Sequence, residues 1–487
     1  MNKKAFKAEL LFYATFLIVC IFILLQSPLA PFAKSSDGVD SSVYIYTAQQ
    51  ILKGQVMYKD IVDHKGPFLY LINIAALFIF NGKFIGIWIF EIISLFVTSI
   101  IMYKTARFFA GKFSSFFAVI TALLFLISVF VGGNLTEEWA LPFITTALYI
   151  FVAYLKENKP LNIVRLLIIS LTFVLTFTIQ ANLAAIWVGF GIVLLIKWII
   201  EKKYKELIHS LSFIILFTTL FLLPFFLYFY FKGVLSNTLY LVFKYNMFEY
   251  FPQPVVFTLK KSFKILAGLY YLSEIPFAIV LFMFLRDKTL INGSVLVAFV
   301  FTSLACSLGR LGIHYFIIFT PLLAIPYSYI FAVIKDSFPK TKYVLLFILF
   351  LFCNYKPAIL QAQYIVENYS EKGYGLFVLP PSTRELLKDL IIKNTKPTDK
   401  ILVKGNQVSL YLYSGRTCAI RFPYYLTASS LAGKYYEKEV EEALPKLIIQ
   451  GDIVNSINSI SLDSLLNEKY RLISNRIDSV EIWKLKE

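Results

Sequence analysis

The chain has 487 residues, of which 58% are hydrophobic and 16% are charged, and its formal net charge is +17. Soluble domains are about 45–50% apolar, so this composition excludes an ordinary soluble protein. The Lys and Arg residues mostly lie between long apolar runs instead of forming one basic patch. This distribution argues against nucleic acid as a partner and favours a multi-pass membrane protein.

The N-terminus begins MNKKAFK and continues as an apolar run from Leu10 to Ala33. This run is too long for a secretory signal peptide and lacks a clear small-x-small cleavage site. Roughly 20 apolar residues cross a membrane, so we expect a retained first helix over residues 10–32. Because cytoplasmic segments are enriched in Lys and Arg, the N-terminus is expected inside and the following loop, residues 34–67, outside.

A short apolar segment follows this loop, from Phe68 to Phe80, and Asn81-Gly82 ends it. It is too short to cross a bilayer comfortably. We therefore expect an interfacial or re-entrant helix that begins at Pro67, within an outer region that covers residues 34–83.

Later apolar runs alternate across the membrane, and basic segments such as KTARFFAGK then fall on the inner side. The run from Leu166 to Ile196 is too long for one helix and has basic residues at both ends. We divide it at Gln180–Asn182 into two helices joined by an outer turn. The sequence then predicts about 11 spans. They are expected over residues 10–32, 84–103, 113–133, 139–155, two within 166–196, 207–231, 265–285, 291–308, 313–334 and 343–359.

From residue 360 onward, charges become frequent and the apolar runs shorten to the length of strands. KILVK, KLIIQ and VEIWKLK predict strands, and ASSLAGKYYEKEVEEAL predicts a helix. STRE fits a capping box that opens another helix, which would run through Lys393. The expected fold is an all-α multi-pass membrane domain over residues 1–359, followed by a small α/β domain over 360–487 on the outer side.

Polar side chains concentrate on the face that the topology assigns to the outside. The candidate site residues are Asp37, Asp40, Tyr58, Asp60, Asp63, His64 and Lys65 in the first outer loop, Glu137 and Glu138 in the next outer turn, and Arg310 and His314 in a later one. Carboxylates and cations together suit a lipid-linked phosphate substrate, because cations neutralise the phosphate and a carboxylate serves as a base or a metal ligand.

Each candidate also has a simpler explanation. Asp40 could be the N-cap of a helix through Leu52, and residues 63–65 could form a solvated loop before a helix that starts with Pro. Glu137 and Glu138 could face the positive end of the following helix dipole. His314 could be an interfacial histidine with ordinary hydrogen bonds. The residues alone leave both explanations open.

The order of these features resembles a known class of membrane enzymes. The stretches that carry the resemblance are GVDSSVYIYTAQQILKGQVMYKDIVDHKGPFLYLIN, NLTEEWALPF, GRLGIHYFIIFTPLL and ILVKGNQVSLYLYSGRTCAIRFPYY. Together they resemble the GT-C class of integral membrane glycosyltransferases, in particular the bacterial relatives of protein O-mannosyltransferases and the aminoarabinose transferase. The first outer loop is the most specific part of the likeness.

The resemblance implies an inverting glycosyltransferase that moves a sugar from a polyprenyl-phosphate carrier to a lipid, glycan or protein acceptor on the outer face of a bacterial plasma membrane. It gives Asp40 the role of general base, and it assigns Glu137 and Glu138 to binding an acceptor or a metal ion. It implies no cofactor except a divalent metal ion in some branches. From their charge we expect Lys65, Arg310 and His314 to hold the lipid phosphate. Tyr58, Asp63 and His64 are also expected to bind substrate, with His64 holding the phosphate or the acceptor.

A flippase or transporter for a lipid-linked saccharide is the alternative function. It would share a basic, aromatic outer surface, but it should also carry inverted repeats and polar residues at the membrane midplane. The sequence has no recognisable repeat, and Glu91 and Glu274, which lie within predicted spans, are the residues that favour this alternative.

Overall fold

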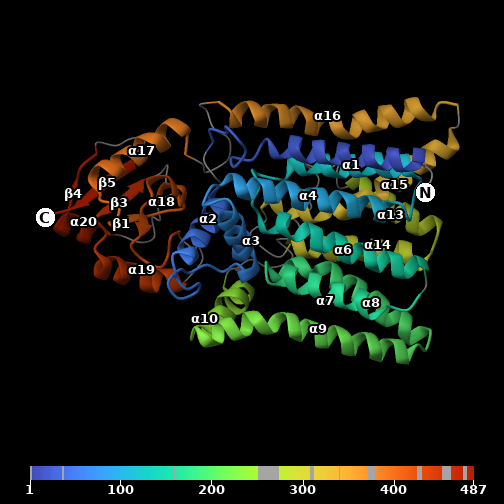
Figure 1. Ribbon diagram of the computed structural model, residues 1–487, viewed down its shortest axis with the longest axis horizontal. Helices are drawn as coiled ribbons and strands as arrows, with labels where there is room; N and C mark the ends of the chain where they lie inside the picture. The colour runs from blue at the N-terminus through green and yellow to red at the C-terminus, as the bar shows by residue number, and fades with distance from the viewer. Residues whose placement is uncertain are drawn as a thin grey trace.

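The computed structural model has two parts, an elongated bundle of helices and a smaller mixed α/β domain at one end of the bundle (Figure 1). It describes residues 3–35, 38–157, 159–249, 274–307, 312–338, 340–370, 379–424, 430–451, 462–474 and 480–486. The start of α1 (Lys3–Leu24) lies at the end of the bundle farthest from the C-terminal domain (Figure 1). The N-terminal helix therefore starts at the end of the bundle opposite the C-terminal domain.

The bundle consists of apolar helices that run roughly along its long axis (Figure 1). After α1 they are α4 (Ile85–Ala106), α5 (Lys112–Phe125), α6 (Thr136–Glu157), α7 (Ile163–Phe177), α8 (Ala185–Ile200), α9 (Tyr204–Phe231), α13 (Glu274–Arg286), α14 (Leu290–Ser307), α15 (Thr320–Ser337) and α16 (Lys342–Asn368). Short 3₁₀ segments are η1 (Leu126–Ser128), η2 (Ala181–Ala184) and η4 (Ile313–Phe319). A π-helical turn, η3 (Tyr240–Tyr245), joins α10 (Leu235–Leu239) to α11 (Asn246–Phe248).

Within the described residues, 8 helices are long and apolar enough to cross a membrane. Three further predicted spans are present as shorter apolar helices, namely Lys112–Ser128, Ile163–Phe177 and Pro276–Arg286. The predicted division of residues 166–196 is confirmed, because α7 ends at Phe177 and η2 begins at Ala181. The part of the predicted span 265–285 that precedes Glu274 lies outside the described residues.

The ends of the first and last bundle helices differ from the prediction. The first helix ends at Leu24 instead of residue 32, since Pro28 and Pro31 have no backbone N–H to continue the ladder. The last helix, α16, continues past residue 359 to Asn368. The Asn368 side chain donates hydrogen bonds to the carbonyls of Leu25 and Ser27, both at 3.0 Å, so the end of α16 holds the chain where it leaves α1.

Two helices of the outer region lie between the bundle and the C-terminal domain, α2 (Val39–Leu52) and α3 (Pro67–Ile79) (Figure 1). The prediction of a short helix that starts at Pro67 is confirmed, and Pro67 occupies its first position, where a missing N–H costs nothing. The rings of Tyr44 in α2 and Tyr70 in α3 pack edge to face, with their centroids 6.2 Å apart.

The C-terminal domain contains one sheet in the order β2-β1-β3-β5-β4. Its strands are β1 (Lys400–Val403), β2 (Thr417–Cys418), β3 (Leu447–Gly451), β4 (Tyr470–Leu472) and β5 (Val480–Leu485). β1 is parallel to both β2 and β3, whereas β5 is antiparallel to β3 and β4. The domain also contains α17 (Pro381–Asn394), α18 (Ser409–Ser414), α19 (Ser430–Ala443) and α20 (Asp463–Lys469).

The sequence predicted three of the five strands of this sheet and the helices α17 and α19. β2 and β4 were missed because two or three residues are too few to produce a visible alternation. The capping box at STRE is wrong: α17 begins at Pro381, directly after Pro380, so Ser382 already lies inside the helix.

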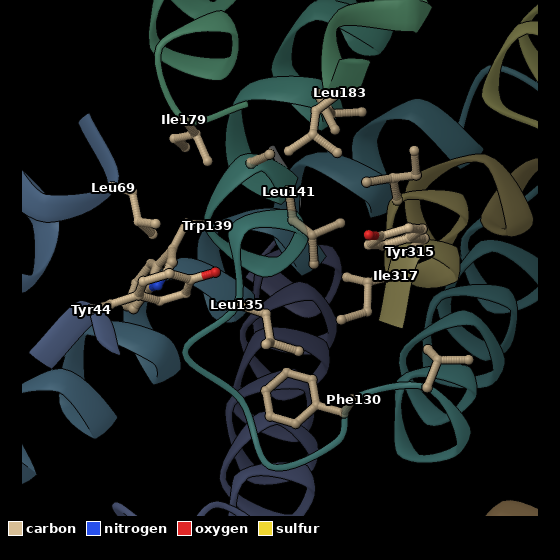
Figure 2. Packing of buried hydrophobic residues seen from close by; sticks show 14 of the residues in the cluster. Tyr44, Leu69, Phe130, Leu135, Trp139, Leu141, Ile179, Leu183, Tyr315 and Ile317 are labelled. Atoms are coloured by element: carbon tan, nitrogen blue, oxygen red, sulfur yellow. The ribbon is translucent and has the colours of Figure 1, made fainter. Parts of the chain in front are cut away.

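Buried side chains from distant parts of the chain converge around the start of α6 (Figure 2). Figure 2 shows Trp139 and Leu141 of α6 among residues from the outer helices, the loop before α6, the α7–α8 connection and η4. These neighbours are Tyr44, Leu69, Phe130, Leu135, Ile179, Leu183, Tyr315 and Ile317. The first turn of α6 is therefore the packing centre at the outer end of the bundle.

The arrangement of the ends predicts a labelling pattern. The four native cysteines are buried, so introduced cysteines should dominate the reaction with a membrane-impermeant maleimide. Thr398→Cys, in an exposed turn of the C-terminal domain, should label in intact spheroplasts, whereas Lys159→Cys, in the α6–α7 loop, should label only after permeabilisation. The reverse pattern would contradict the predicted topology.

Candidate functional site

The turn that carries Asp63, His64 and Lys65 is held against the end of α7 by backbone contacts. Gly66 N–H donates to the carbonyl of Ile179 at 3.0 Å, and Phe68 N–H donates to the carbonyl of Thr178 at 3.0 Å. A Cβ at position 66 would lie 2.1 Å from the carbonyl oxygen of Thr178. Only glycine lets the two backbones approach this closely.

This close approach places Lys65 beside the turn that joins α7 and α8. Lys65 Nζ donates to Gln180 Oε1 at 2.9 Å. The Thr136 hydroxyl, at the start of α6, lies 3.0 Å from the same Gln180 oxygen and 2.8 Å from Glu137 Oε2. A polar chain therefore connects the cation of the first outer loop to the acidic start of α6.

Asp63 is wholly buried, and its carboxylate receives donors from several parts of the chain. Its Oδ2 accepts a hydrogen bond from the Tyr70 hydroxyl of α3. Its Oδ1 accepts from the Tyr424 hydroxyl of the C-terminal domain at 2.5 Å and from the backbone N–H of His64 at 2.6 Å. Burial acts to raise the pKa of Asp63, but His64 and the two tyrosine hydroxyls outweigh it and leave this pKa below its ordinary value.

His64 lies beside Asp63, with Nδ1 3.2 Å from Asp63 Oδ1, and is buried. Its carbonyl accepts from Asn246 Nδ2 at 2.9 Å, and its ring packs edge to face on Tyr245. Burial lowers the pKa of His64, while the charge of Asp63 and the weaker one of Asp40 oppose this effect. The result is a neutral, oriented imidazole at neutral pH.

Asp40 is half-buried in the first turn of α2, and its charge reaches His64. The N-cap explanation for Asp40 is wrong, because Gly38 is the N-cap of α2 and Asp40 lies two positions inside the helix. Among the described residues, none forms a hydrogen bond with the Asp40 carboxylate.

Glu137 and Glu138 are buried in the first turn of α6, where the positive end of the helix dipole favours acidic groups. Glu137 Oε1 and both carboxylate oxygens of Glu138 have no hydrogen-bond donor in the described part of the chain. Glu91 of α4, also buried, lies close enough to Glu138 for the two carboxyl groups to interact. Buried acceptors without donors are suited to an incoming cation or hydroxyl group.

Asn134 connects these acidic residues to the helix that carries Asp40. Its Nδ2 donates to Ser41 Oγ at 3.0 Å and to Asn73 Oδ1 at 3.1 Å, and its Oδ1 accepts from Trp139 Nε1 at 2.9 Å. Its backbone N–H donates to Glu91 Oε1 at 2.6 Å. One buried side chain thus fixes α2, α3 and α6 relative to one another.

The loop before α6 adopts an uncommon backbone conformation to bring Asn134 to this place. Four consecutive residues, 131–134, have positive φ, and two of them are glycines. A Cβ on Gly133 would lie 2.4 Å from Glu91 Oε1. Strain of this kind persists only where the surrounding structure holds it, and it concentrates at functional sites.

The other predicted site residues have different surroundings. Tyr58 is buried with its hydroxyl donating to the carbonyl of Lys65 at 2.6 Å, so it supports the loop. His314 is half-buried at the start of η4, and its ring contacts the neighbouring Tyr315. Asp60 is exposed and accepts from the backbone N–H of Val56 at 2.8 Å. Asp37 and Arg310 lie outside the described residues.

Sequence reasoning missed the residues that join the site across long separations, namely Tyr70, Asn134, Gln180 and Tyr424. Gln180 attracted attention only as a break in an apolar run. Tyr424 belongs to the RFPYY stretch, but nothing in that stretch indicates a partner 361 positions away.

The described residues contain no group of three or more His, Cys, Asp or Glu side chains that could hold a metal ion. The unpaired oxygens of Glu137 and Glu138 are nevertheless of the ligand type that Mg²⁺ and Mn²⁺ prefer. If a divalent ion binds here, these two carboxylates would supply protein ligands to it.

The close approach at Gly66 predicts a steric effect of a single methyl group. Gly66→Ala should destabilise the protein by about 1–3 kcal/mol and displace Lys65, because rigid backbone blocks the new Cβ. Gly191→Ala in α8, where nothing lies within 4 Å, is the matched control and should leave stability unchanged or slightly higher. Thermal unfolding in detergent checks both, and equal midpoints would contradict the packing.

The buried His64 predicts a pH dependence of stability. Its folded-state pKa lies below 6.5, so the unfolded chain binds the proton more readily. Neutral His64 therefore stabilises the folded state fully above pH 6.5, and this stabilisation is lost as the pH falls below 6.5. The thermal midpoint of the wild type should therefore fall between pH 7 and 5 more than that of His64→Gln. His209→Gln, at an exposed position in α9, should behave like the wild type.

Comparisons with known proteins bear on the fold. No protein-family model matches the sequence, and no curated protein matches it either. Among solved structures, ArnT from Cupriavidus metallidurans bound to undecaprenyl phosphate is 12% identical, with a TM-score of 0.66 over 98% of each chain. AglB from Archaeoglobus fulgidus, an oligosaccharyltransferase solved with an inhibitory peptide and dolichol phosphate, is 13% identical, with a TM-score of 0.59 over 90% of this chain and 69% of that one.

An oligosaccharyltransferase from Archaeoglobus fulgidus, solved with Zn and sulfate, matches with a TM-score of 0.57 and 15% identity over 90% of this chain and 67% of that one. At these identities the likeness concerns the fold. ArnT and AglB are both GT-C membrane glycosyltransferases. The chain therefore has a GT-C-like fold. In its described residues a small α/β domain follows the bundle of apolar helices.

Proposed function

We propose that this protein is an inverting glycosyltransferase that moves a sugar from a polyprenyl-phosphate carrier to an acceptor on the outer face of the membrane. The observation that carries the proposal is the half-buried Asp40 carboxylate, which has no hydrogen-bond donor among the described residues. Asp40 and Lys65 both act on the electrostatic environment of His64, and this supports a base and a cation in the same site.

Asp40 is the general base in this proposal. It takes the proton from the acceptor hydroxyl as the oxygen attacks the anomeric carbon of the sugar. The new bond forms on the face opposite the carrier, the bond from the anomeric carbon to the phosphate oxygen breaks, and the carrier leaves with the electron pair. Displacement from the opposite face inverts the anomeric centre, and a positioned base contributes about 10²–10⁴-fold to such a step.

Lys65 is the cation that meets the departing phosphate, where negative charge develops. Gln180 holds its Nζ at 2.9 Å, and the close approach at Gly66 fixes the loop, so the ammonium group is in place before substrate binds. Arg310, through its guanidinium group, and His314, through a ring N–H, are proposed to make further contacts to the phosphate.

Glu137 and Glu138 are proposed to bind the acceptor, directly or through a divalent ion. Their donor-free oxygens would accept hydrogen bonds from acceptor hydroxyl groups. ArnT has been solved with undecaprenyl phosphate and AglB with dolichol phosphate, and this supports a carrier of the same chemistry here.

The flippase alternative receives less support. Glu91, one of the two residues that favoured it, accepts a hydrogen bond from the backbone of Asn134 and lies near Ser27 Oγ, at 3.5 Å. These contacts give Glu91 a local structural role at the outer end of the bundle. The side chain of Glu274 lies outside the described residues.

The base assignment predicts that Asp40→Asn lowers transfer by about 10²–10⁴-fold, since the amide cannot accept the proton. Radiolabelled undecaprenyl-phosphate sugars, supplied one at a time to purified protein, measure transfer. Native mass spectrometry with undecaprenyl phosphate measures carrier binding, which should be unchanged. Asp389→Asn, on the exposed face of α17, is the control and should transfer at the wild-type rate. A full rate for Asp40→Asn would overturn the assignment.

A further inference from the structure

The C-terminal domain contacts the first outer loop through the segment that follows β2. The backbone N–H of Cys418 donates to the Tyr46 hydroxyl of α2 at 2.8 Å, and the carbonyl of Arg421 accepts from Val62 N–H at 2.9 Å. Three residues further along, the Tyr424 hydroxyl donates to Asp63 Oδ1 at 2.5 Å. The domain therefore reaches one residue of the membrane domain that is both charged and wholly buried.

This arrangement follows from the direction of the strands. β2 and β1 run parallel, and the chain leaves β2 at its carboxyl end, directly toward α2 and the first outer loop. Binding sites of α/β sheets lie at the carboxyl ends of parallel strands. Here that edge of the sheet faces the candidate site.

Domain docking does not depend on the Tyr424 hydroxyl. The rings of Tyr46 and Tyr411 pack with their centroids 5.2 Å apart. Arg384 donates to the carbonyls of Lys34 at 3.2 Å and Ser35 at 3.3 Å. These contacts, with the two backbone hydrogen bonds above, would hold the domain in place without that hydroxyl.

The hydroxyl acts on the Asp63–His64 pair. It lies 2.5 Å from Asp63 Oδ1 and 3.4 Å from His64 Nδ1, and these two atoms are themselves 3.2 Å apart. Asp63 is wholly buried, so each of its donors limits where the carboxylate can turn. The carboxylate in turn orients the imidazole, as a buried acid does for a functional histidine.

We propose that Tyr424 is a positioning residue for the transfer reaction: its hydroxyl fixes Asp63, and Asp63 holds the His64 imidazole in the orientation in which it meets substrate. This inference rests on the proposed function. Catalytic geometry in the membrane domain then depends on the docked C-terminal domain, which does more than brace the bundle.

Several groups face His64 and set its protonation. Asp63, Asp40 and Lys65 act through charge, the ring of Tyr245 packs against the imidazole, and Tyr424 competes for Asp63 Oδ1. Without the Tyr424 hydroxyl, Asp63 Oδ1 loses a competing hydrogen-bond donor. Its negative charge then acts more strongly on the His64 imidazole and favours the protonated, imidazolium form. The pKa of His64 should therefore move upward in Tyr424→Phe.

Tyr424→Phe removes the hydroxyl and keeps the ring. We expect kcat to fall about ten- to hundredfold, because a displaced site group has effects of this size, with the KM for the carrier within about twofold. Tyr470→Phe is the matched control, since Tyr470 is a buried tyrosine of the same domain whose hydroxyl donates to the carbonyl of Pro445 at 2.9 Å. It should keep wild-type kcat.

The pH at which the His64 ring titrates is a second measurement, and it would not change if Tyr424 had only a structural role. The chain has 3 histidines, so histidine-selective isotope labelling gives few ring signals, and His64→Gln identifies the one required. The His64 signal should titrate at higher pH in Tyr424→Phe than in the wild type and Tyr470→Phe. If the wild type transfers no sugar, the proposed function fails, and this titration alone decides the role of Tyr424.

A double-mutant cycle with Asp63→Asn separates positioning from folding. If Tyr424 acts through Asp63, adding Tyr424→Phe to Asp63→Asn should change kcat by less than about twofold. Additive losses would overturn the proposal, as would a wild-type kcat and an unmoved His64 titration in Tyr424→Phe. Increased protease release of the C-terminal domain from Tyr424→Phe would also overturn it, because the hydroxyl would then be a docking contact.

Discussion

A buried carboxylate must be met by hydrogen-bond donors, and this requirement at Asp63 joins three separate parts of the chain. Tyr70 supplies a donor from a helix of the outer region, His64 from the same turn, and Tyr424 from the C-terminal domain. Because the carboxylate is wholly buried, loss of any donor leaves a charged oxygen without solvent to replace it. The Asp63 carboxylate thereby links the outer loop to the docked C-terminal domain at one side chain.

Close contacts of the backbone at two glycines, Gly66 and Gly133, position the residues of the proposed site. Gly66 lets the DHKGP turn lie against the end of α7, and this places Lys65 on Gln180. Gly133 lets the loop before α6 pass Glu91, and this brings Asn134 to Ser41, the neighbour of Asp40. The cation and the acidic residues of the proposed site are thus positioned by packing in which a single methyl group has no room.

Much of the membrane domain could be predicted because the bilayer thickness sets the length that each apolar run needs to cross it, independently of the other runs. The break at Gln180–Asn182 and the short helix from Pro67 followed from length and local residue type alone, and both are confirmed. The N-cap role of Asp40 was wrong because several adjacent residues can cap a helix, and the backbone placed Gly38 there. The two shortest strands were missed because they form only beside longer neighbours.

The sequence by itself determined that the chain is a multi-pass membrane protein, the approximate positions of its spans, the start of the C-terminal α/β region and the loop that carries the acidic and basic candidates. Each of these properties depends on the residues within a single segment, so each could be predicted segment by segment. Only the tertiary structure decided that Asp63 supports His64, that Asn134 binds α2 to α6, and that Tyr424 reaches the membrane domain. Such contacts join residues up to 361 positions apart, and they arise from buried polar groups finding partners after the helices have packed.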